Sequence, residues 1–237
     1  MLIAPEIVYF NVPDAGSTRR IACAQWGKPG EKPTLLCAHG LTRTGRDFDF
    51  VASALASNFH ILAPDMRGRG QSAWLDDAAG YNNSAYVGDV LFILQSLGIS
   101  NVYWLGTSMG GIMGMMAANA APGLIQAMII NDIGCHIPAD GLKRIGDLSR
   151  MPTLFDSRDE AEACFRLRSA SFGISDDDHW QHLYAHAIAR SGDGWQFTYD
   201  PQIFAGFATA NTTEGLSLWP LWGAVQAMPV LLLRGAE

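Results

Sequence analysis

The stretch that decides the fold is NVYWLGTSMGGIMGMMAANA, at residues 101–120. Its beginning is apolar and typical of a buried strand, and its second half is rich in small and apolar residues and typical of a helix. Between them lies a Gly-x-Ser-x-Gly sequence centred on Ser108. A strand-to-helix reversal this tight leaves almost no room for side chains two residues before and after the serine, where Gly106 and Gly110 stand. The pattern predicts a turn that raises the Ser108 hydroxyl above a sheet, at the positive end of a helix.

Outside this stretch, short apolar runs alternate with helical patterns. We expect further strands at residues 34–38, 60–63, 127–130 and 229–233, and helices at residues 47–57 and 82–98. In the first of these helices Phe50, Val51, Ala54 and Leu55 stand at helical spacing. Residues 8–12 and 19–27 are interpreted as an N-terminal hairpin. Strands that alternate with helices form parallel units, so the expected fold is α/β, with a mostly parallel sheet and helices on both faces.

Residues 136–228 interrupt this alternation. They are helical in pattern and rich in aromatic side chains, and another predicted strand follows them. We interpret them as a helical cap inserted between two strands of one sheet, rather than as a second domain in series. The predicted organisation is therefore a first part of the core at residues 1–135, a cap at residues 136–228 and a core strand at residues 229–237.

The composition excludes several kinds of protein. The 237 residues are 49% hydrophobic and 16% charged, which suits a globular protein with a sizeable core. A net charge of −7 argues against nucleic acid or an anionic membrane as a partner, because both need a basic surface. The four cysteines lack metal-ligand spacing and are interpreted as free thiols.

The chain has no charged residue from Val90 to Asn131. Because glycines and a proline break this stretch repeatedly, we expect a buried α/β centre rather than a membrane span. The N-terminus shows no basic flank and no clear cleavage site, as a signal peptide would. These features predict a cytoplasmic protein.

Two segments that follow predicted strands carry polar residues. The segment HGLT, residues 39–42, can aim the backbone N–H of Leu41 at a substrate carbonyl oxygen, and with the N–H of Met109 this would form an oxyanion hole. The His39 ring is expected mainly to bond nearby backbone. The residues expected around the substrate are His39, Gly40, Thr107 and His136.

The other segment, DMRGRGQS at residues 65–72, is interpreted as a polar, flexible loop. Its arginines and glycines suggest phosphate binding. The segment matches neither a P-loop nor a Gly-x-Gly-x-x-Gly fingerprint, so we do not expect a phosphate site there.

Four segments in this order, HGLT, DMRGRGQS, GTSMGG and NDIG (residues 131–134), resemble the α/β-hydrolase superfamily and, more narrowly, its bacterial cap-bearing, esterase-like serine hydrolases. The resemblance covers essentially the whole chain and places the family's nucleophile at Ser108. Relatives that open epoxides or cleave carbon–halogen bonds carry aspartate there, so serine implies acyl transfer to water through an acyl-enzyme. No cofactor or metal is implied. The expected substrate is a small-to-medium carboxylic ester or related acyl compound, and the aromatic residues of the cap favour an apolar or aromatic group.

The chain departs from the family in its catalytic triad. In the family the triad acid follows the strand that matches residues 229–233, and the histidine follows one further strand. The resemblance therefore implies that both lie beyond Glu237, together with a final strand and helix, and that the sequence is truncated. Glu237 itself falls a residue or two early for the acid. Asp132 stands where some members place the acid, and a structural role bonding backbone N–H groups is the favoured alternative.

Three histidines, His179, His182 and His186, are spaced to share one face of a helix. This spacing suits a metal. Because the segment lacks the glutamate of a zinc-protease motif, we expect no metal and interpret it as an exposed cap helix with an acidic first turn. Two other functions remain open for the whole chain: a non-catalytic relic that binds a hydrophobic ligand, and a cofactor-free haloperoxidase-like activity at the same serine. The sequence does not predict the oligomeric state.

Overall fold

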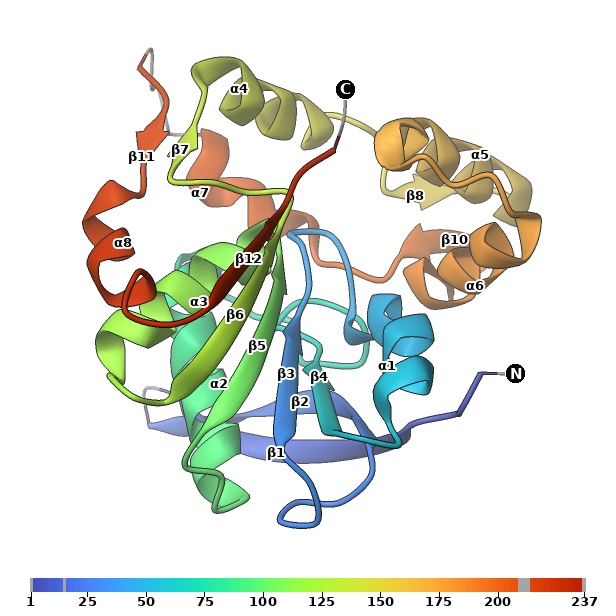
Figure 1. Cartoon of the computed structure of the whole chain (residues 1–237). Coiled ribbons are helices and arrows are strands. Elements are labelled where there is room, and N and C mark those ends of the chain that lie inside the picture. The colour runs from blue at the N-terminus through green and yellow to red at the C-terminus, as the bar shows by residue number, and fades with distance from the viewer. Residues whose placement is uncertain (1, 15, 209–213, 236–237) are drawn as a thin grey trace.

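The computed structural model describes residues 2–14, 16–208 and 214–235. At its centre lies a seven-stranded sheet in the order β1-β2-β4-β3-β5-β6-β12 (Figure 1). Its strands are β1 (Glu6–Asp14), β2 (Ser17–Trp26), β3 (Thr34–Ala38), β4 (His60–Pro64), β5 (Val102–Thr107), β6 (Ile125–Asn131) and β12 (Val230–Leu233). From β4 to β12 every neighbouring pair is parallel, which confirms the predicted, mostly parallel sheet.

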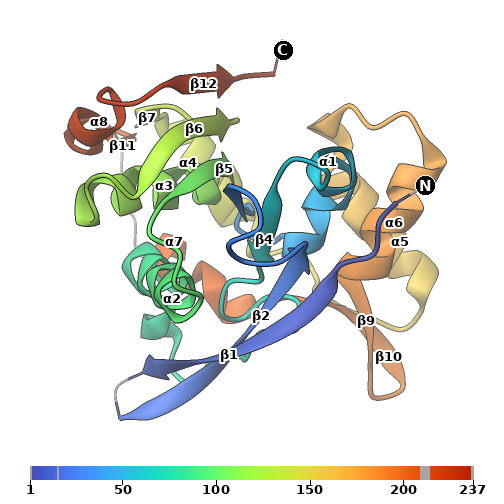
Figure 2. The same ribbon diagram turned by 60° about the horizontal axis from the view of Figure 1, so that its bottom comes forward.

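The predicted N-terminal hairpin is confirmed and is longer than expected. β1 and β2 pair antiparallel along their whole length, and β2 pairs antiparallel with β4. Figure 2 shows the hairpin as a long twisted ribbon at the border of the molecule. It extends the sheet at the edge opposite β12.

Helices cover both faces of the sheet, as predicted (Figure 1). Those beside the parallel strands are α1 (Asp49–Leu55), α2 (Asn83–Ser96), α3 (Met109–Ala120) and α8 (Trp219–Val225). Helix α3 packs against α2 and α8, while α1 lies on the other face. The Asn82 side chain caps α2 by accepting from the Ala85 N–H, and Gly98 follows the helix in the left-handed conformation.

The first predicted helix is present and is shorter than expected. A 3₁₀ turn at Gly45–Phe48 precedes α1, and Phe48 and Ala52 are the apolar residues that are buried. Phe50 is 38% exposed and meets the His179 ring edge-on, with 4.4 Å between ring centroids. Phe50 therefore faces the segment after β6 rather than the sheet.

The charge-free stretch forms the centre of the molecule, as α2, β5, α3 and β6. The Trp104 side chain of β5 is fully buried, and its indole N–H donates to the Gly110 carbonyl at 3.0 Å. Met113 and Met115 of α3 are fully buried as well. Across the described ranges, no helix is long and apolar enough to cross a membrane. All four cysteines are free, as predicted.

The segment between β6 and β12 lies over the carboxyl ends of the parallel strands (Figure 1). Before α8 its helices are α4 (Ala139–Leu148), α5 (Arg158–Arg168), α6 (Asp177–Ala187) and α7 (Ala205–Ala208). It also contains short strands, which the sequence analysis did not predict: β7 (His136–Ile137), β8 (Leu154–Phe155), β9 (Ile188–Ser191), β10 (Gly194–Phe197) and β11 (Leu216–Ser217). Strands β8, β10 and β9 form one small sheet.

The chain enters and leaves this segment through a two-stranded neck. Strand β7 pairs antiparallel with β11, with His136 opposite Ser217 and Ile137 opposite Leu216. Beside this pair, the Leu218 N–H donates to the Cys135 carbonyl at 2.7 Å. The neck therefore brings together two parts of the chain that are about 80 residues apart in sequence.

Candidate active site

Ser108 stands between the end of β5 and the start of α3, at the strand-to-helix turn predicted from the sequence. Its φ of 51° lies in the left-handed region, which residues other than glycine rarely adopt. Its N–H donates to the Asn131 carbonyl of β6 at 2.8 Å, which fixes the turn to the neighbouring strand. Helix α3 begins at the next residue, so the positive end of its dipole lies at the serine.

Two glycines make this turn possible. A Cβ at Gly106 would lie 2.4 Å from the Gly110 carbonyl oxygen, and a Cβ at Gly110 would lie 1.9 Å from the Ala38 carbonyl oxygen. Both distances are far below van der Waals contact. The turn therefore packs backbone against backbone at the end of β3, where residues 39–42 begin.

Residues 39–42 lie directly beside the serine. A Cβ at Gly40 would be 3.9 Å from the Ser108 Cβ. The Gly40 carbonyl accepts from the Arg43 N–H at 3.1 Å and pairs with the His39 Nδ1 at 2.7 Å. In a trans peptide the N–H points opposite to the carbonyl, so the Leu41 N–H points away from both groups. Within the described residues, neither the Leu41 N–H nor the Met109 N–H has a hydrogen-bond acceptor.

The His39 ring is fully buried and both of its nitrogens are engaged. The Met66 N–H donates to Nε2 at 2.9 Å, so Nε2 is the acceptor and Nδ1 carries the proton that goes to the Gly40 carbonyl. Burial lowers the pKa of His39 to about 4, which keeps the ring neutral at pH 7. The ring therefore orients the backbone of residues 40 and 41, and its burial keeps it from touching a substrate.

The other predicted site residues are distributed along the same end of the sheet. Thr107 ends β5, and its hydroxyl accepts from the Asn131 side-chain amide at 3.3 Å. Asp132 follows β6 at a φ of 57° and is exposed. Its carboxylate accepts no hydrogen bond from the described residues, so the favoured structural role is not observed there. His136 is exposed and belongs to the neck, in β7.

None of the six histidines, all of which are described, hydrogen-bonds to Ser108. His60 begins β4, at the amino end of the strand, whereas Ser108 follows the carboxyl end of a parallel strand. Glu237 and the histidine predicted beyond it lie outside the described residues. The structure therefore brings together the predicted nucleophile and the two N–H groups, without a general base.

Comparisons with known proteins identify the family of this chain. Residues 33–161, more than half of the chain, match the family described as the alpha/beta hydrolase fold. The chain belongs to the α/β-hydrolase family. It is 37% identical to the 3-hydroxybutyrate-oligomer hydrolase of Cupriavidus necator, over the whole chain and 83% of that protein.

Solved structures show the same relationship. An α/β hydrolase from Novosphingobium aromaticivorans is 29% identical and superposes with a TM-score of 0.86, over 100% of this chain and 83% of that one. A protein from Rickettsia typhi is 33% identical with a TM-score of 0.83, over 98% of this chain and 79% of that one.

In this α/β hydrolase the loop of residues 65–72 is mostly buried, so its interpretation as a flexible loop is wrong. Asp65 is 7% exposed, and its carboxylate accepts from the N–H groups of Gly45 and Gln71 at 2.7 and 2.9 Å. Burial raises the pKa of this carboxyl to about 6, against the opposing effect of the two N–H donors. The loop is therefore a polar junction inside the protein.

Both arginines of this loop are buried, and the sequence analysis predicted no contact for either of them. The Arg67 guanidinium bonds to the Asp89 carboxylate of α2 and lies 3.4 Å from Asp14 of β1. The Arg69 side chain is completely buried and donates to the Leu41 carbonyl at 2.8 Å. Burial lowers the pKa of Arg69. No local signal marks these contacts, because the partners lie far away in the sequence.

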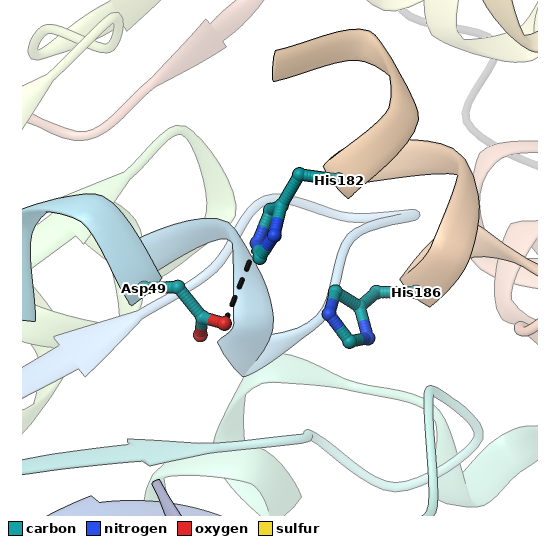
Figure 3. A group of neighbouring side chains, drawn as sticks. All are labelled: Asp49, His182 and His186. Atoms are coloured by element: carbon teal, nitrogen blue, oxygen red, sulfur yellow. Dashed lines mark ion pairs between the residues drawn. The ribbon is translucent and has the colours of Figure 1, made fainter. Parts of the chain in front are cut away.

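Figure 3 shows Asp49, His182 and His186 where α1 meets α6. The His182 Nε2 lies 3.4 Å from an Asp49 carboxylate oxygen, and one donor atom from each of the three residues lies within 4.8 Å of the others. However, the Arg46 guanidinium donates to both Asp49 oxygens at 2.5–3.0 Å. A metal ion here would lie next to a guanidinium that already balances the carboxylate charge.

We therefore interpret this group as a polar contact that holds α6 against α1. Burial and the charge of Arg46 lower the pKa of His186 to about 4, so the ring is neutral at pH 7. His182 also lies 3.1 Å from the Arg46 carbonyl oxygen. The prediction of an exposed helix is wrong for this face, since both histidines face α1.

Proposed function

We propose that this protein hydrolyses carboxylic esters with Ser108 as the nucleophile. The observation that carries the proposal is the strained turn at φ 51°, which holds the serine beside two backbone N–H groups that lack acceptors in the described residues. A serine so placed suits attack on a carbonyl carbon. The N–H groups of Leu41 and Met109 suit stabilisation of the negative charge that then develops on the carbonyl oxygen.

In the proposed reaction, Ser108 Oγ forms a bond to the ester carbonyl carbon and gives its proton to a general base. The carbonyl oxygen becomes an oxyanion and accepts hydrogen bonds from the N–H groups of Leu41 and Met109. The intermediate then collapses, the bond to the alcohol oxygen breaks, and the alcohol leaves with the proton. Water adds to the acyl-enzyme in the same way, releasing the acid and restoring the Ser108 hydroxyl.

The acid and base of this reaction remain predictions. The family resemblance places both after the strand that corresponds to β12, with Asp132 as the alternative acid. Asp132 lies beside that strand, since its N–H donates to the Leu233 carbonyl at 2.9 Å. Its exposed carboxylate, without a partner among the described residues, could orient a histidine that comes from the β12 side.

As substrates we propose short esters of hydroxy acids. The relative from Cupriavidus necator, 37% identical over the whole chain, is named for oligomers of 3-hydroxybutyrate, whose units are joined by ester bonds. The aromatic residues after β6 do not argue for an aromatic substrate, because several pack against one another in a core of their own. These are Phe165, Trp180, Tyr184 and Phe197.

A fluorophosphonate probe, which labels activated serines, tests the nucleophile. In a protein that includes the proposed acid and histidine, we expect labelling at Ser108, as located by peptide mass spectrometry, and Ser108→Ala to abolish it. Ser96→Ala is the matched control, because among the described residues this α2 hydroxyl bonds only the Phe92 carbonyl on the surface. If such a protein folds and stays unlabelled, the proposal is contradicted and the ligand-binding relic is favoured.

Hydrolysis of 3-hydroxybutyrate dimer and trimer, compared with p-nitrophenyl butyrate, tests the substrate class. We expect release of 3-hydroxybutyrate, lost in Ser108→Ala. If Ser108 is labelled and the p-nitrophenyl ester is cleaved but the oligomers are not, the nucleophile stands and the proposed substrate class is wrong.

A further inference from the structure

The Arg69 side chain lies between residues 39–42 and the start of α3, completely buried. Its Nε donates to the Leu41 carbonyl oxygen at 2.8 Å, and its Nη2 lies 3.7 Å from the Met109 sulfur. Its Nη1 donates to the Arg67 carbonyl and to the Tyr86 hydroxyl, both at 2.7 Å. A single guanidinium therefore contacts both residues whose N–H groups are proposed to bind the oxyanion.

No carboxylate contacts this guanidinium in the part of the chain that is described. Its carbon lies 4.7 Å from the centre of the Tyr86 ring and 5.9 Å from that of the Tyr81 ring. The nearest acidic connection is indirect, through the Tyr81 hydroxyl, which donates to Asp200 at 2.5 Å. Buried charges in proteins are ordinarily paired, because burial strips them of water. Arg69 is therefore a buried positive charge without a direct counter-ion.

Arg67 shows that the same loop can pair a buried arginine. It is 4% exposed, two residues earlier, and bonds to the Asp89 carboxylate with Asp14 nearby. Both side chains reach α2, Arg67 at Asp89 and Arg69 at Tyr86, but only Arg69 also contacts Leu41 and Met109 beside the serine turn. The missing counter-ion is thus specific to the arginine beside the proposed oxyanion hole.

Leu41 is held on both sides of its α-carbon. The His39 ring bonds the carbonyl of Gly40, in the peptide that carries the Leu41 N–H. Arg69 bonds the carbonyl of Leu41, in the next peptide. These two contacts fix both peptide planes and so fix the direction of the Leu41 N–H.

The segment after β10 holds the arginine in place. The Gly70 N–H donates to the Thr198 carbonyl at 2.7 Å, and the Asp200 N–H donates to the Gly68 carbonyl at 2.8 Å. These bonds flank Arg69 and join its loop to the inserted segment, which lies between β6 and β12.

We propose that Arg69 is a positioning residue for the ester hydrolysis, one that fixes Leu41 and Met109 and places an unpaired positive charge behind the two N–H groups that receive the oxyanion. This inference rests on the proposed function. The negative charge exists only in the tetrahedral state, so the cation stabilises that state more than the neutral ester. The contribution is larger in a buried site than in water, because the effective dielectric constant is lower.

Two substitutions separate charge from geometry. Arg69→Gln removes the charge and keeps a hydrogen-bond donor. Arg69→Lys keeps the charge but cannot make the forked contacts of a guanidinium. Arg67→Lys is the matched control, since it changes a buried arginine of the same loop that has its own carboxylates.

Each protein is assayed for kcat and KM on p-nitrophenyl butyrate and for inhibition by butylboronic acid. Ser108 Oγ adds to the boron and forms a negatively charged tetrahedral adduct that resembles the intermediate, whereas KM reports on the neutral ester in the simplest case. In Arg69→Gln we expect kcat to fall roughly 10- to 100-fold and the boronate Ki to rise by a similar factor, with KM changed by less than about twofold. Arg69→Lys should fall between this variant and the wild type. Arg67→Lys should leave the ratio of boronate Ki to KM unchanged.

The possible failures are distinguishable. A wild-type protein that includes the proposed acid and histidine, and neither cleaves the ester nor binds the boronate, contradicts the proposed function itself. If the wild type does both, a folded Arg69→Gln whose boronate Ki is unchanged, or moves in step with KM, contradicts only the role of Arg69. If Arg69→Gln does not fold, Arg69→Met, which also removes the charge, takes its place, and a boronate Ki within about twofold of the wild type then overturns the inference.

Discussion

The turn around Ser108 and the loop of residues 65–72 meet at the same end of the sheet, but they are stabilised by opposite means. In the turn, Gly106 and Gly110 let backbone pack directly on backbone, with no space for one further carbon. In the loop, buried charged side chains bond to distant elements, as Arg67 does to Asp89. The comparison teaches that one region is fixed by excluded volume and the other by the bonds of buried charged side chains. The turn should therefore fail when an atom is added, and the loop when a charge is removed.

The largest loss of stability is expected from removing the charge in α2 that pairs with an arginine of the loop. Asp89→Ala leaves the Arg67 guanidinium buried with only Asp14 at 3.4 Å. Breaking a buried ion pair costs about 3–5 kcal/mol, because the remaining charge stays desolvated. Urea unfolding measures this difference. Asp147→Ala, which breaks an exposed pair with Lys143, should not change the unfolding midpoint measurably. Equal effects of the two substitutions would contradict the stabilising role of the buried charged side chains.

A single added carbon should break the turn. In Gly110→Ala the new Cβ would lie 1.9 Å from the Ala38 carbonyl oxygen, so the strand, the turn or both must move. We expect the free energy of unfolding to fall by about 3 kcal/mol, at the upper end of the usual cost of overpacking. Gly88→Ala is the control, since its Cβ on α2 meets no atom within 4 Å. That change should raise stability by about 1 kcal/mol through helix propensity. A well-folded Gly110→Ala with unaltered stability would show that the turn is not sterically constrained.

His39 joins the two regions, because it bonds Gly40 beside the turn and Met66 in the loop. Its pKa in the folded protein is about 4, below the usual 6.5, so its stabilising effect is fully present above pH 6.5 and is lost as the pH falls toward 4. The shift corresponds to roughly 3 kcal/mol. Asp65 acts in the opposite sense, because its raised pKa favours stability at low pH. The contribution of His39 is therefore measured as a difference between wild type and variant, not from the wild-type pH dependence alone.

We expect His39→Asn, which does not titrate, to flatten the decline of stability between pH 6.5 and 4. Urea unfolding at a series of pH values measures the slope. His60→Asn is the comparison at the other end of the sheet, where burial also lowers the pKa of the ring. If the decline of stability with falling pH is unchanged in His39→Asn, protonation of His39 is not its cause.

The smallest effect is expected where the loop meets the inserted segment. The Tyr81 hydroxyl donates to Asp200 at 2.5 Å and accepts from the Leu75 N–H at 2.7 Å. Tyr81→Phe leaves both groups without this partner and should cost about 1–2 kcal/mol. Tyr9→Phe removes an exposed hydroxyl that bonds Gln71 and should change the stability by less than about 0.5 kcal/mol. Thermal unfolding measures the two losses of stability. Equal decreases of the midpoint temperature in Tyr81→Phe and Tyr9→Phe would contradict a larger contribution from the buried contact.

The serine turn could be predicted because its constraint is local. Glycine at two fixed positions, an apolar run before and small residues after are all visible within residues 101–120. The parallel strands could be predicted for the same reason, since each is a short apolar run between turn residues. Gly40 lies beside Ser108 because the two residues follow the carboxyl ends of neighbouring parallel strands, β3 and β5.

The buried loop could not be predicted, because its partners are separated from it in sequence. Arg69 bonds to Leu41, Tyr86 and the Arg67 carbonyl, and no spacing rule connects the first two with residue 69. A segment rich in arginine and glycine is therefore indistinguishable in sequence from a solvated loop. The contact of Phe50 with His179, in the segment between β6 and β12, could not be predicted for a related reason, since periodicity alone does not say what covers a helix.

The neck formed by β7 and β11 has a consequence for how this fold can vary. A hydrogen bond joins Cys135 and Leu218, beside the paired strands β7 and β11. The chain therefore leaves the core and returns to it at one place, as it does at the two ends of a hairpin loop. The entropy of closing that loop depends only weakly on its length, so insertions within the excursion cost little closure entropy where they leave the contacts of Thr198 and Asp200 with residues 65–72 intact. The region that covers the proposed catalytic serine can thus vary in length between these contacts, whereas the serine belongs to a turn with no space for one further carbon atom.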